Sequence, residues 1–113
     1  MDLKIFKYKK VASTNNVAIT KIKQGYKSGI IISETQTNGR GQYGKKWISN
    51  KGNLFLSIFF TINKKNKISN LVKSNLKLIK KILSKYVKLK INIKVPNDIM
   101  INKKKICGIL NET

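Results

Sequence analysis

The stretch Glu34–Ser57, ETQTNGRGQYGKKWISNKGNLFLS, is a glycine-rich loop set between two apolar runs. It contains the only arginine of the chain, Arg40, and the only tryptophan, Trp47, in a sequence otherwise rich in Lys, Asn and Ile. Three glycines crowd around that arginine: Gly39, Gly41 and Gly44. Glycines this dense let a backbone take positive φ and turn its N–H groups toward an anion. The stretch predicts a phosphate or carboxylate site, with a solvated turn between two strands as the alternative.

The spacing of these glycines resembles the dinucleotide-binding fingerprint, but that motif also needs a following helix and an acidic residue about 20 positions later. Strand-like apolar sequence follows the loop instead, and no acidic residue occurs between Glu34 and Asp98. The GK[ST] sequence of a P-loop is absent as well. Both nucleotide motifs are therefore rejected.

Length and composition favour a single compact domain of 113 residues. No apolar run reaches the roughly 18 residues that cross a bilayer, and the first residues do not form a signal peptide. We therefore expect a cytoplasmic protein without membrane contact. With one cysteine and no histidine, the usual zinc ligand sets are missing. No protein metal site is expected, and any metal would be a hard cation carried in by phosphates.

The formal net charge of +21 raises the alternative of a basic nucleic-acid-binding module. The distribution of charge counts against it, because the lysines are spread along the whole chain and arginine, the residue suited to bidentate phosphate contacts, occurs once. The charge predicts non-specific attraction to polyanions and to acidic substrates or partners. No specific nucleic acid is expected.

Apolar periodicity predicts the order of helices and strands. A short strand at 3–11 precedes a helix that ends at Gly25, and the helix is followed by a buried strand at 29–34. The run 53–62 is expected to be a central strand, and a helix of about five turns begins at Lys67. Strict alternation predicts a strand over 87–95, and a hairpin follows over 99–110.

Five motifs in sequence resemble the catalytic domain of biotin protein ligase, the biotin–[acetyl-CoA-carboxylase] ligase. They are Ser13-Thr14-Asn15, Glu34-x-Gln36-x-x-Gly39-Arg40-Gly41-x-x-Gly44-x-x-Trp47-x-Ser49, Gly52-Asn53-Leu54-Phe55-Leu56-Ser57, Lys94-x-Pro96-Asn97-Asp98 and Lys105-x-x-Gly108-Ile109-Leu110. The resemblance covers nearly the whole chain. It implies an α+β fold, a mixed and largely antiparallel sheet with helices on one face, as in class II aminoacyl-tRNA synthetases. Residues 1–113 would be the N-terminal portion of that domain.

The resemblance also implies a two-step reaction. Biotin and ATP, with Mg²⁺, would give biotinyl-AMP and pyrophosphate, and the biotinyl group would pass to a lysine of the biotin carboxyl carrier domain of acetyl-CoA carboxylase. A lipoate ligase-like acyltransferase, which shares this fold and chemistry, is the alternative from the same superfamily.

Site residues carried over from the family fall into three groups. Lys105 and Arg40 would be catalytic, as the cations at the carboxylate and α-phosphate. Biotin would be bound by Ser13, Thr14, Asn15, Gln36, Gly39, Arg40, Gly41, Gln42 and Gly108. The nucleotide would be bound by Arg40, Trp47, Asn97, Asp98 and Lys105. For Ser13, Thr14 and Asn15, plain capping of the following helix is the competing interpretation, and for Trp47 it is a place in the core.

The sequence departs from the family pattern at three points. Gln42 stands where the family usually has an arginine associated with retaining the adenylate, and Val95 replaces a tryptophan. The chain also stops at Thr113, where the family continues with further strands, helices and a small C-terminal β domain. An inactive remnant is therefore a further alternative. A last strand without neighbours would expose an unpaired edge, which leaves homodimer formation open.

Overall fold

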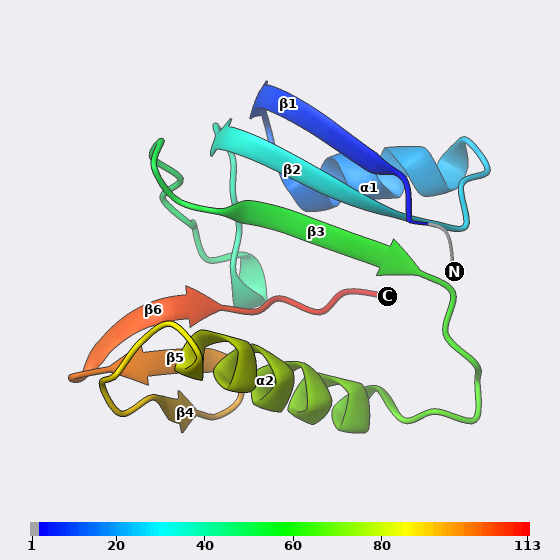
Figure 1. Ribbon diagram of the computed structural model, residues 1–113. Coiled ribbons are helices and arrows are strands. Elements are labelled where there is room, and N and C mark those ends of the chain that lie inside the picture. Colours follow the sequence, from blue (N-terminus) through cyan, green and yellow to red (C-terminus); the bar gives the residue numbers. More distant parts are fainter. Residues whose placement is uncertain (1–2) are drawn as a thin grey trace. The chain divides into compact units, whose positions relative to one another are not determined.

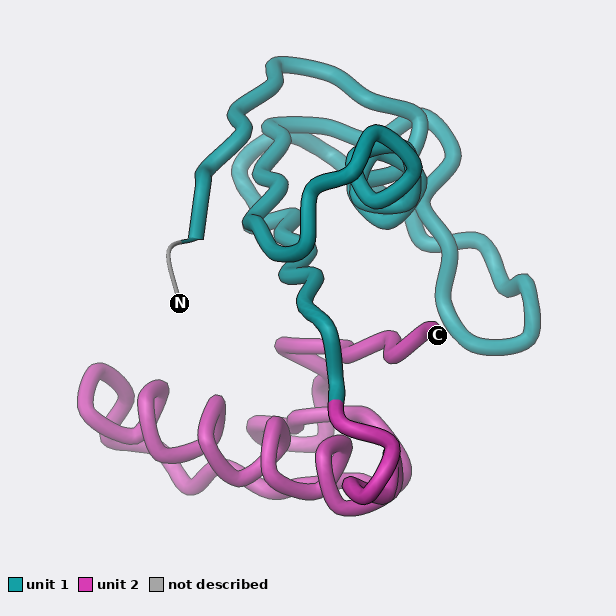
Figure 2. The backbone as a smooth tube through the Cα atoms, turned by 90° about the vertical axis from the view of Figure 1, so that its right-hand side faces the viewer, with its two compact units in different colours: residues 1–62 teal, residues 63–113 magenta. Residues whose placement is uncertain are grey.

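The computed structural model describes residues 3–113. Its contacts group into two compact units, Met1–Ile62 and Asn63–Thr113 (Figure 2). The sequence had suggested one compact body, but each unit has an apolar cluster of its own. The buried residues of these clusters are Ala18, Ile31 and Phe59 in the first unit and Leu76, Ile91 and Ile99 in the second.

The first unit is a three-stranded sheet with one helix (Figure 1). Its elements are β1 (Ile5–Val11), α1 (Thr14–Lys23), β2 (Ser28–Gln36), the short 3₁₀ turn η1 (Gln42–Gly44) and β3 (Phe55–Phe60). The strands lie in the order β1-β2-β3, with β1 parallel and β3 antiparallel to β2. The helix α1 connects the two parallel strands and packs on β2 and β3.

The predicted buried strand at 29–34 forms part of β2, which is central in this sheet, but its residues alternate in burial rather than being buried throughout. Ile31 is fully buried beneath α1 with Ala18 and Phe59, whereas Ile30 and Ile32 are only half-buried on the other face. The alternation follows from the pleat, since α1 covers one face of the sheet.

The prediction of a central strand over 53–62 is wrong, because β3 ends the strand order of this sheet. Its side chains divide between two faces. Phe55, Ser57 and Phe59 are buried, whereas Leu56 and Ile58 are exposed. High apolar content made both faces of this strand look like core, and periodicity could not tell them apart.

The second unit packs the amphipathic helix α2 (Ile68–Ser84) against the strands β4 (Asn92–Lys94), β5 (Asp98–Ile101) and β6 (Lys104–Gly108). These strands form an antiparallel sheet in the order β4-β5-β6. The predicted helix and hairpin are confirmed. Asn102 and Lys103, at the hairpin turn, both have positive φ.

The predicted strand over 87–95 is largely wrong, because only Asn92–Lys94 pair with β5. Val87 instead donates its backbone N–H to the Leu83 carbonyl at 3.0 Å, at the end of α2. The partner strand β5 is itself only four residues long. The nine alternating residues 87–95 are therefore more numerous than the residues of β5 that could pair with them.

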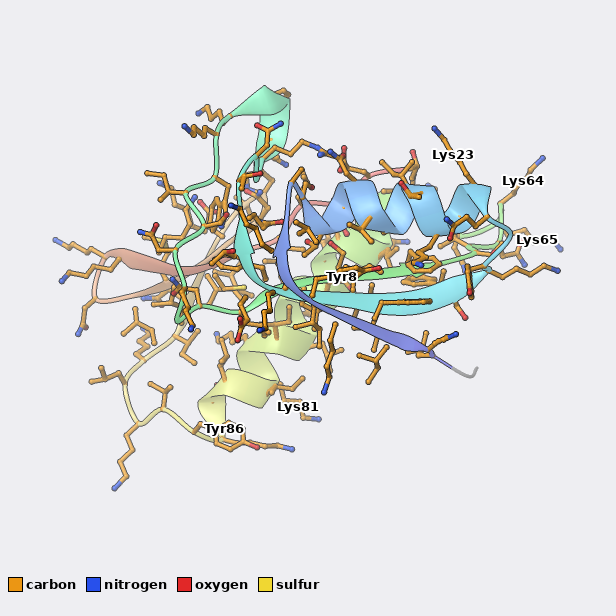
Figure 3. The ribbon with its side chains drawn as sticks, turned by 90° about the horizontal axis from the view of Figure 1, so that it is seen from above. Tyr8, Lys23, Lys64, Lys65, Lys81 and Tyr86 are labelled. Atoms are coloured by element: carbon orange, nitrogen blue, oxygen red, sulfur yellow. The ribbon has the colours of Figure 1, made fainter. Side chains whose placement is uncertain are left out.

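Together the elements form the expected α+β fold, although as two small sheets, each with one helix, rather than one. Within residues 3–113, no helix is long and apolar enough to cross a membrane. Lysine side chains such as Lys23 on α1 and Lys81 on α2 project away from their helices (Figure 3). Lys23 and Lys81 are exposed, whereas Lys21 and Lys80 are half-buried, and the Lys21 ammonium lies 4.4 Å from the centroid of the Phe6 ring.

Candidate active site

The Ser13-Thr14-Asn15 segment forms the N-terminus of α1. Ser13 is the N-cap, and its hydroxyl oxygen accepts a hydrogen bond from the Asn16 backbone N–H at 3.3 Å. Ser13 and Thr14 are buried. The capping interpretation is therefore confirmed for Ser13. It does not account for Thr14, whose side chain points to a different partner.

Gln36 is that partner, and it ends β2 directly beside α1. Its Oε1 accepts from the Thr14 backbone N–H at 2.8 Å and from the Thr14 hydroxyl at 3.2 Å. Its Nε2 donates to Ser49 Oγ at 3.0 Å, and the Ser49 hydroxyl donates to the Trp47 carbonyl at 2.9 Å. These bonds fix which end of the Gln36 amide is oxygen and which is nitrogen.

Ser57 is a member of this cluster that the sequence analysis did not assign to the site. It lies on β3, and its hydroxyl donates to the Asn15 side-chain oxygen and lies 2.7 Å from Thr14 Oγ1. A signal was present in the sequence, because Ser57 is the only polar residue of the strand FLSIFF. A buried hydroxyl among phenylalanines needs a partner.

The glycine-rich loop begins against this cluster. A Cβ on Gly39 would lie 2.6 Å from Ser49 Oγ, 2.7 Å from Gln36 Nε2 and 2.8 Å from the Trp47 carbonyl oxygen. Only glycine fits there. Gly41 has ordinary room, with Lys45 O at 3.8 Å and a ring carbon of Trp47 at 3.9 Å. Trp47 thus packs beside the loop and is not part of either apolar cluster of residues 3–113.

Arg40 reaches from this loop back to α1. Its Nη1 donates to Asn16 Oδ1 at 2.7 Å and to Ser13 Oγ at 3.2 Å. Three segments far apart in sequence thus meet in one polar cluster: the start of α1, the end of β2 and the loop. The structure brings together seven of the predicted biotin-binding residues, namely Ser13, Thr14, Asn15, Gln36, Gly39, Arg40 and Gly41.

The second unit holds the predicted residues Asn97, Asp98, Lys105 and Gly108, near the β5–β6 hairpin, whereas Gln42 and Trp47 lie in the loop of the first unit. The Lys105 ammonium lies 3.3 Å from Asp98 Oδ1, an ion pair between side chains that are 43% and 16% exposed. Asn97 donates its side-chain N–H to the Ile109 carbonyl at 3.1 Å, and its own carbonyl accepts from Ile109 N. Burial, and then the charge of Asp98, raises the pKa of the nearby Cys107 thiol, which stays protonated.

The sequence model of the Biotin/lipoate A/B protein ligase family matches residues 7–113. The chain belongs to this family. The match includes both units. Three of the five motifs that carried the resemblance lie in the first unit, and the two that begin at Lys94 and Lys105 lie in the second.

Known members of the Biotin/lipoate A/B protein ligase family agree with this assignment. The bifunctional ligase/repressor BirA of Escherichia coli (strain K12) is 31% identical over 104 residues, which cover 90% of this chain and 32% of BirA. The chain thus spans about a third of the length of that relative.

Solved structures of biotin protein ligases have the same fold. The enzyme from Aquifex aeolicus, in complex with biotin and ATP, matches with a TM-score of 0.80 and 27% identity over 97% of this chain and 47% of its own. The enzyme from Leishmania major, in complex with biotinyl-5-AMP, matches with a TM-score of 0.72 and 26% identity over 100% of this chain and 53% of its own. The class II synthetase-like fold that the sequence predicts is confirmed.

Metal ligands in this family member are scarce. Among residues 3–113 no three His, Cys, Asp or Glu side chains come close enough to hold an ion. Asp98, the acidic residue predicted near the nucleotide, is paired with Lys105. The described side chains thus form no cage of their own for Mg²⁺, which prefers oxygen ligands.

Proposed function

We propose that this chain is the biotin-binding and nucleotide-binding part of a biotin protein ligase. Biotin would bind at the cluster of α1, β2 and the glycine-rich loop, and ATP would activate its carboxylate to give biotinyl-AMP and pyrophosphate. The biotinyl group would then pass to a lysine of a biotin carboxyl carrier domain. The observation that carries the proposal is the Thr14–Gln36–Ser49 hydrogen-bonded cluster beside Gly39 and Arg40.

The chemistry of that cluster suits a small neutral polar ring. A ureido ring offers one oxygen acceptor and two N–H donors, which need short polar side chains in fixed orientation. The Gln36 amide and the three hydroxyls at Ser13, Thr14 and Ser49 supply both donors and acceptors. Within the described residues, no buried polar side-chain atom lacks a partner. The cluster is thus already oriented before a ligand arrives.

The charged end of the reaction would involve cations of both units. In-line attack by the biotin carboxylate on the α-phosphate builds negative charge, which Arg40 and Lys105 would stabilise. Asp98 would hold the Lys105 ammonium until the phosphate replaces it as partner. That Arg40 and Lys105, with Trp47, Asn97 and Gly108, face one ligand stays a prediction, because these residues are divided between the two units.

Calorimetry with biotin and, separately, with lipoate tests the binding half of this proposal. We expect heat of binding with biotin and none with lipoate. Thr14→Val removes the hydroxyl bonded to Gln36 and should weaken biotin binding about tenfold or more, the effect of one lost hydrogen bond in a buried site. Thr20→Val makes the same substitution on the same helix, at an exposed hydroxyl that donates to the Asn16 backbone carbonyl rather than to Gln36, and is the control. Equal affinity of Thr14→Val and the unsubstituted chain would refute the assignment.

Pyrophosphate release tests the second half. With Mg²⁺-ATP present, release should depend on biotin, and Lys105→Met should abolish it while leaving the heat of biotin binding in place. Biotin binding without pyrophosphate release at any ATP concentration would refute the proposed activation step and leave only the biotin-binding site.

A further inference from the structure

Asn16 accepts a hydrogen bond from the Arg40 side chain, which joins the glycine-rich loop to α1. It is the third residue of α1, an exposed position that no motif of the sequence singled out. Its Oδ1 accepts from Arg40 Nη1 at 2.7 Å, and the second acceptor, Ser13 Oγ, lies farther away at 3.2 Å. Ser13 Oγ also accepts from the Asn16 backbone N–H. Asn16 is therefore the stronger of the two acceptors.

Backbone hydrogen bonds hold together the loop that Arg40 belongs to. Trp47 N donates to the Gly39 carbonyl at 2.8 Å, and Gly41 N donates to the Lys45 carbonyl at 2.7 Å. Arg40 itself pairs with Lys46 in an isolated antiparallel bridge. The loop is thus a small hairpin. A contact that fixes the Arg40 side chain fixes the hairpin with it.

The position of the guanidinium has an electrostatic cost. The N-terminus of a helix carries a partial positive charge, which disfavours a cation beside it. The first turn of α1 contains no acidic residue to compensate for that charge. A local acceptor is needed for the arginine to stay there, and the Asn16 amide oxygen supplies it.

We propose that Asn16 is a positioning residue that holds the Arg40 guanidinium, and with it the glycine-rich hairpin, against the first turn of α1 before any ligand binds. Its effect on biotin rests on the proposed function, because a hairpin held closed binds a ligand without first being ordered. Loss of the Asn16 side chain raises the fraction of molecules with an open hairpin, to which biotin does not bind. A carboxylate at this position holds the guanidinium at least as well, since both partners are then charged and the helix N-terminus favours an anion.

An arginine-specific protease tests the tether without any ligand. Because Arg40 is the only arginine, such a protease can cut the chain at one place, directly after Arg40. Under native conditions the cleavage rate follows the fraction of molecules in which the hairpin is open. We expect Asn16→Ala to raise this rate about tenfold, the effect of losing a hydrogen bond to a charged group. Asn16→Asp should return the rate to that of the unsubstituted chain or below it.

The matched control is Asn70→Ala. Asn70 is the third residue of α2, exposed like Asn16, and within residues 3–113 its side chain has no hydrogen bond. Its substitution should leave cleavage unchanged. Equal cleavage of Asn16→Ala and the unsubstituted chain, or equal acceleration by Asn70→Ala, would overturn the proposal. So would an Asn16→Asp variant that is cut as fast as Asn16→Ala.

Cleavage in the presence of biotin, with its Kd from calorimetry on the same variants, separates the tether from the proposed function. If biotin binds only to the closed hairpin, it lowers the open fraction, and biotin should slow the cleavage of Asn16→Ala by a factor of 1 + [biotin]/Kd. Accelerated cleavage in Asn16→Ala that bound biotin does not slow would show that the tether does not act on ligand binding, and would overturn the positioning role. If no variant binds biotin while cleavage behaves as expected, the tether stands and the biotin ligase proposal fails.

Discussion

Gln42 follows Gly41 at the start of η1, where the family pattern has an arginine, and it is half-buried. The neighbouring Arg40 is committed to Asn16 and Ser13. A neutral amide at position 42 cannot take over a charge–phosphate contact, because hydrogen bonds to charged groups contribute about 1.5–3 kcal/mol. The loop therefore has less charge near a bound adenylate than the family pattern provides.

Gln42→Arg should slow the release of biotinyl-AMP by about tenfold or more, since 1.4 kcal/mol corresponds to a factor of ten. Stopped-flow or filter measurement of the adenylate off-rate checks this. Gln42→Leu, which removes the amide without adding charge, should stay close to the unsubstituted chain. Equal off-rates for the arginine variant and the unsubstituted chain would show that position 42 does not face the adenylate.

Gly39 should be the least replaceable glycine of the loop. A Cβ there would meet Ser49, Gln36 and the Trp47 carbonyl at 2.8 Å or less. Because one of these atoms is backbone, Gly39→Ala should destabilise the first unit by about 1–3 kcal/mol, the usual cost of overpacking. Gly41→Ala, whose Cβ would make only ordinary contacts, is the stability control. Thermal unfolding followed by tryptophan fluorescence should separate the two variants.

Rare residue types in a lysine-rich chain located the loop with Arg40 and Trp47, whereas the resemblance to biotin protein ligase assigned Gln36 and the segment 13–15 to the site. They did not identify Ser49, Ser57 or Asn16 as its members. Ser57 becomes visible only once β3 is placed beside α1, and Asn16 only once Arg40 is seen to reach back across the loop. Such contacts span 24 or more positions, which no local pattern reports.

At the scale of elements, α2 shows most directly how one helix face builds a unit. Leu76 is 4% exposed and packs with Ile91 and Ile99, whereas Leu78, two residues along, is 55% exposed. The three- and four-residue spacing of apolar positions predicted this helix and its ends within one or two residues. The strands were predicted less well, since strand pairing depends on the length and position of a partner.

Leu76→Ala should destabilise the second unit by about 2–5 kcal/mol, because it leaves a cavity in the core beneath α2. Leu78→Ala makes the same chemical change at the exposed position and should cost less than about 1 kcal/mol. Urea unfolding followed by circular dichroism measures both. Equal destabilisation by the two variants would contradict the assignment of the buried face.

At the scale of the whole molecule, the lysines dominate. They supply all but one of the 25 basic residues behind the formal net charge of +21, and they occur in both units. A charge of this size attracts any polyanion. It does not by itself make a nucleic-acid site.

Binding to DNA should therefore be weak, independent of sequence and strongly dependent on salt. We expect affinity to fall at least about a hundredfold between roughly 50 and 200 mM salt, as several lysine–phosphate contacts release counterions. Fluorescence anisotropy with two unrelated duplexes of equal length measures this, and Arg40→Lys should change nothing. A marked preference for one duplex at the higher salt concentration would revive the nucleic-acid-binding alternative.

The Ser13 hydroxyl places a limit on what can lie against it. Its oxygen already accepts from the Asn16 N–H and from Arg40, and a hydroxyl oxygen has two lone pairs. Only its proton is left for a third group. If Ser13 faces the ring of biotin as proposed, its hydroxyl can donate a hydrogen bond to the ring oxygen but cannot accept one from the ring N–H groups. Iminobiotin carries an imine in place of that oxygen, and the protonated imine can only donate hydrogen bonds. It would then meet the donating Ser13 hydroxyl without an acceptor between them. We therefore expect iminobiotin to bind more weakly than biotin, and more weakly still as the pH falls and the imine is protonated.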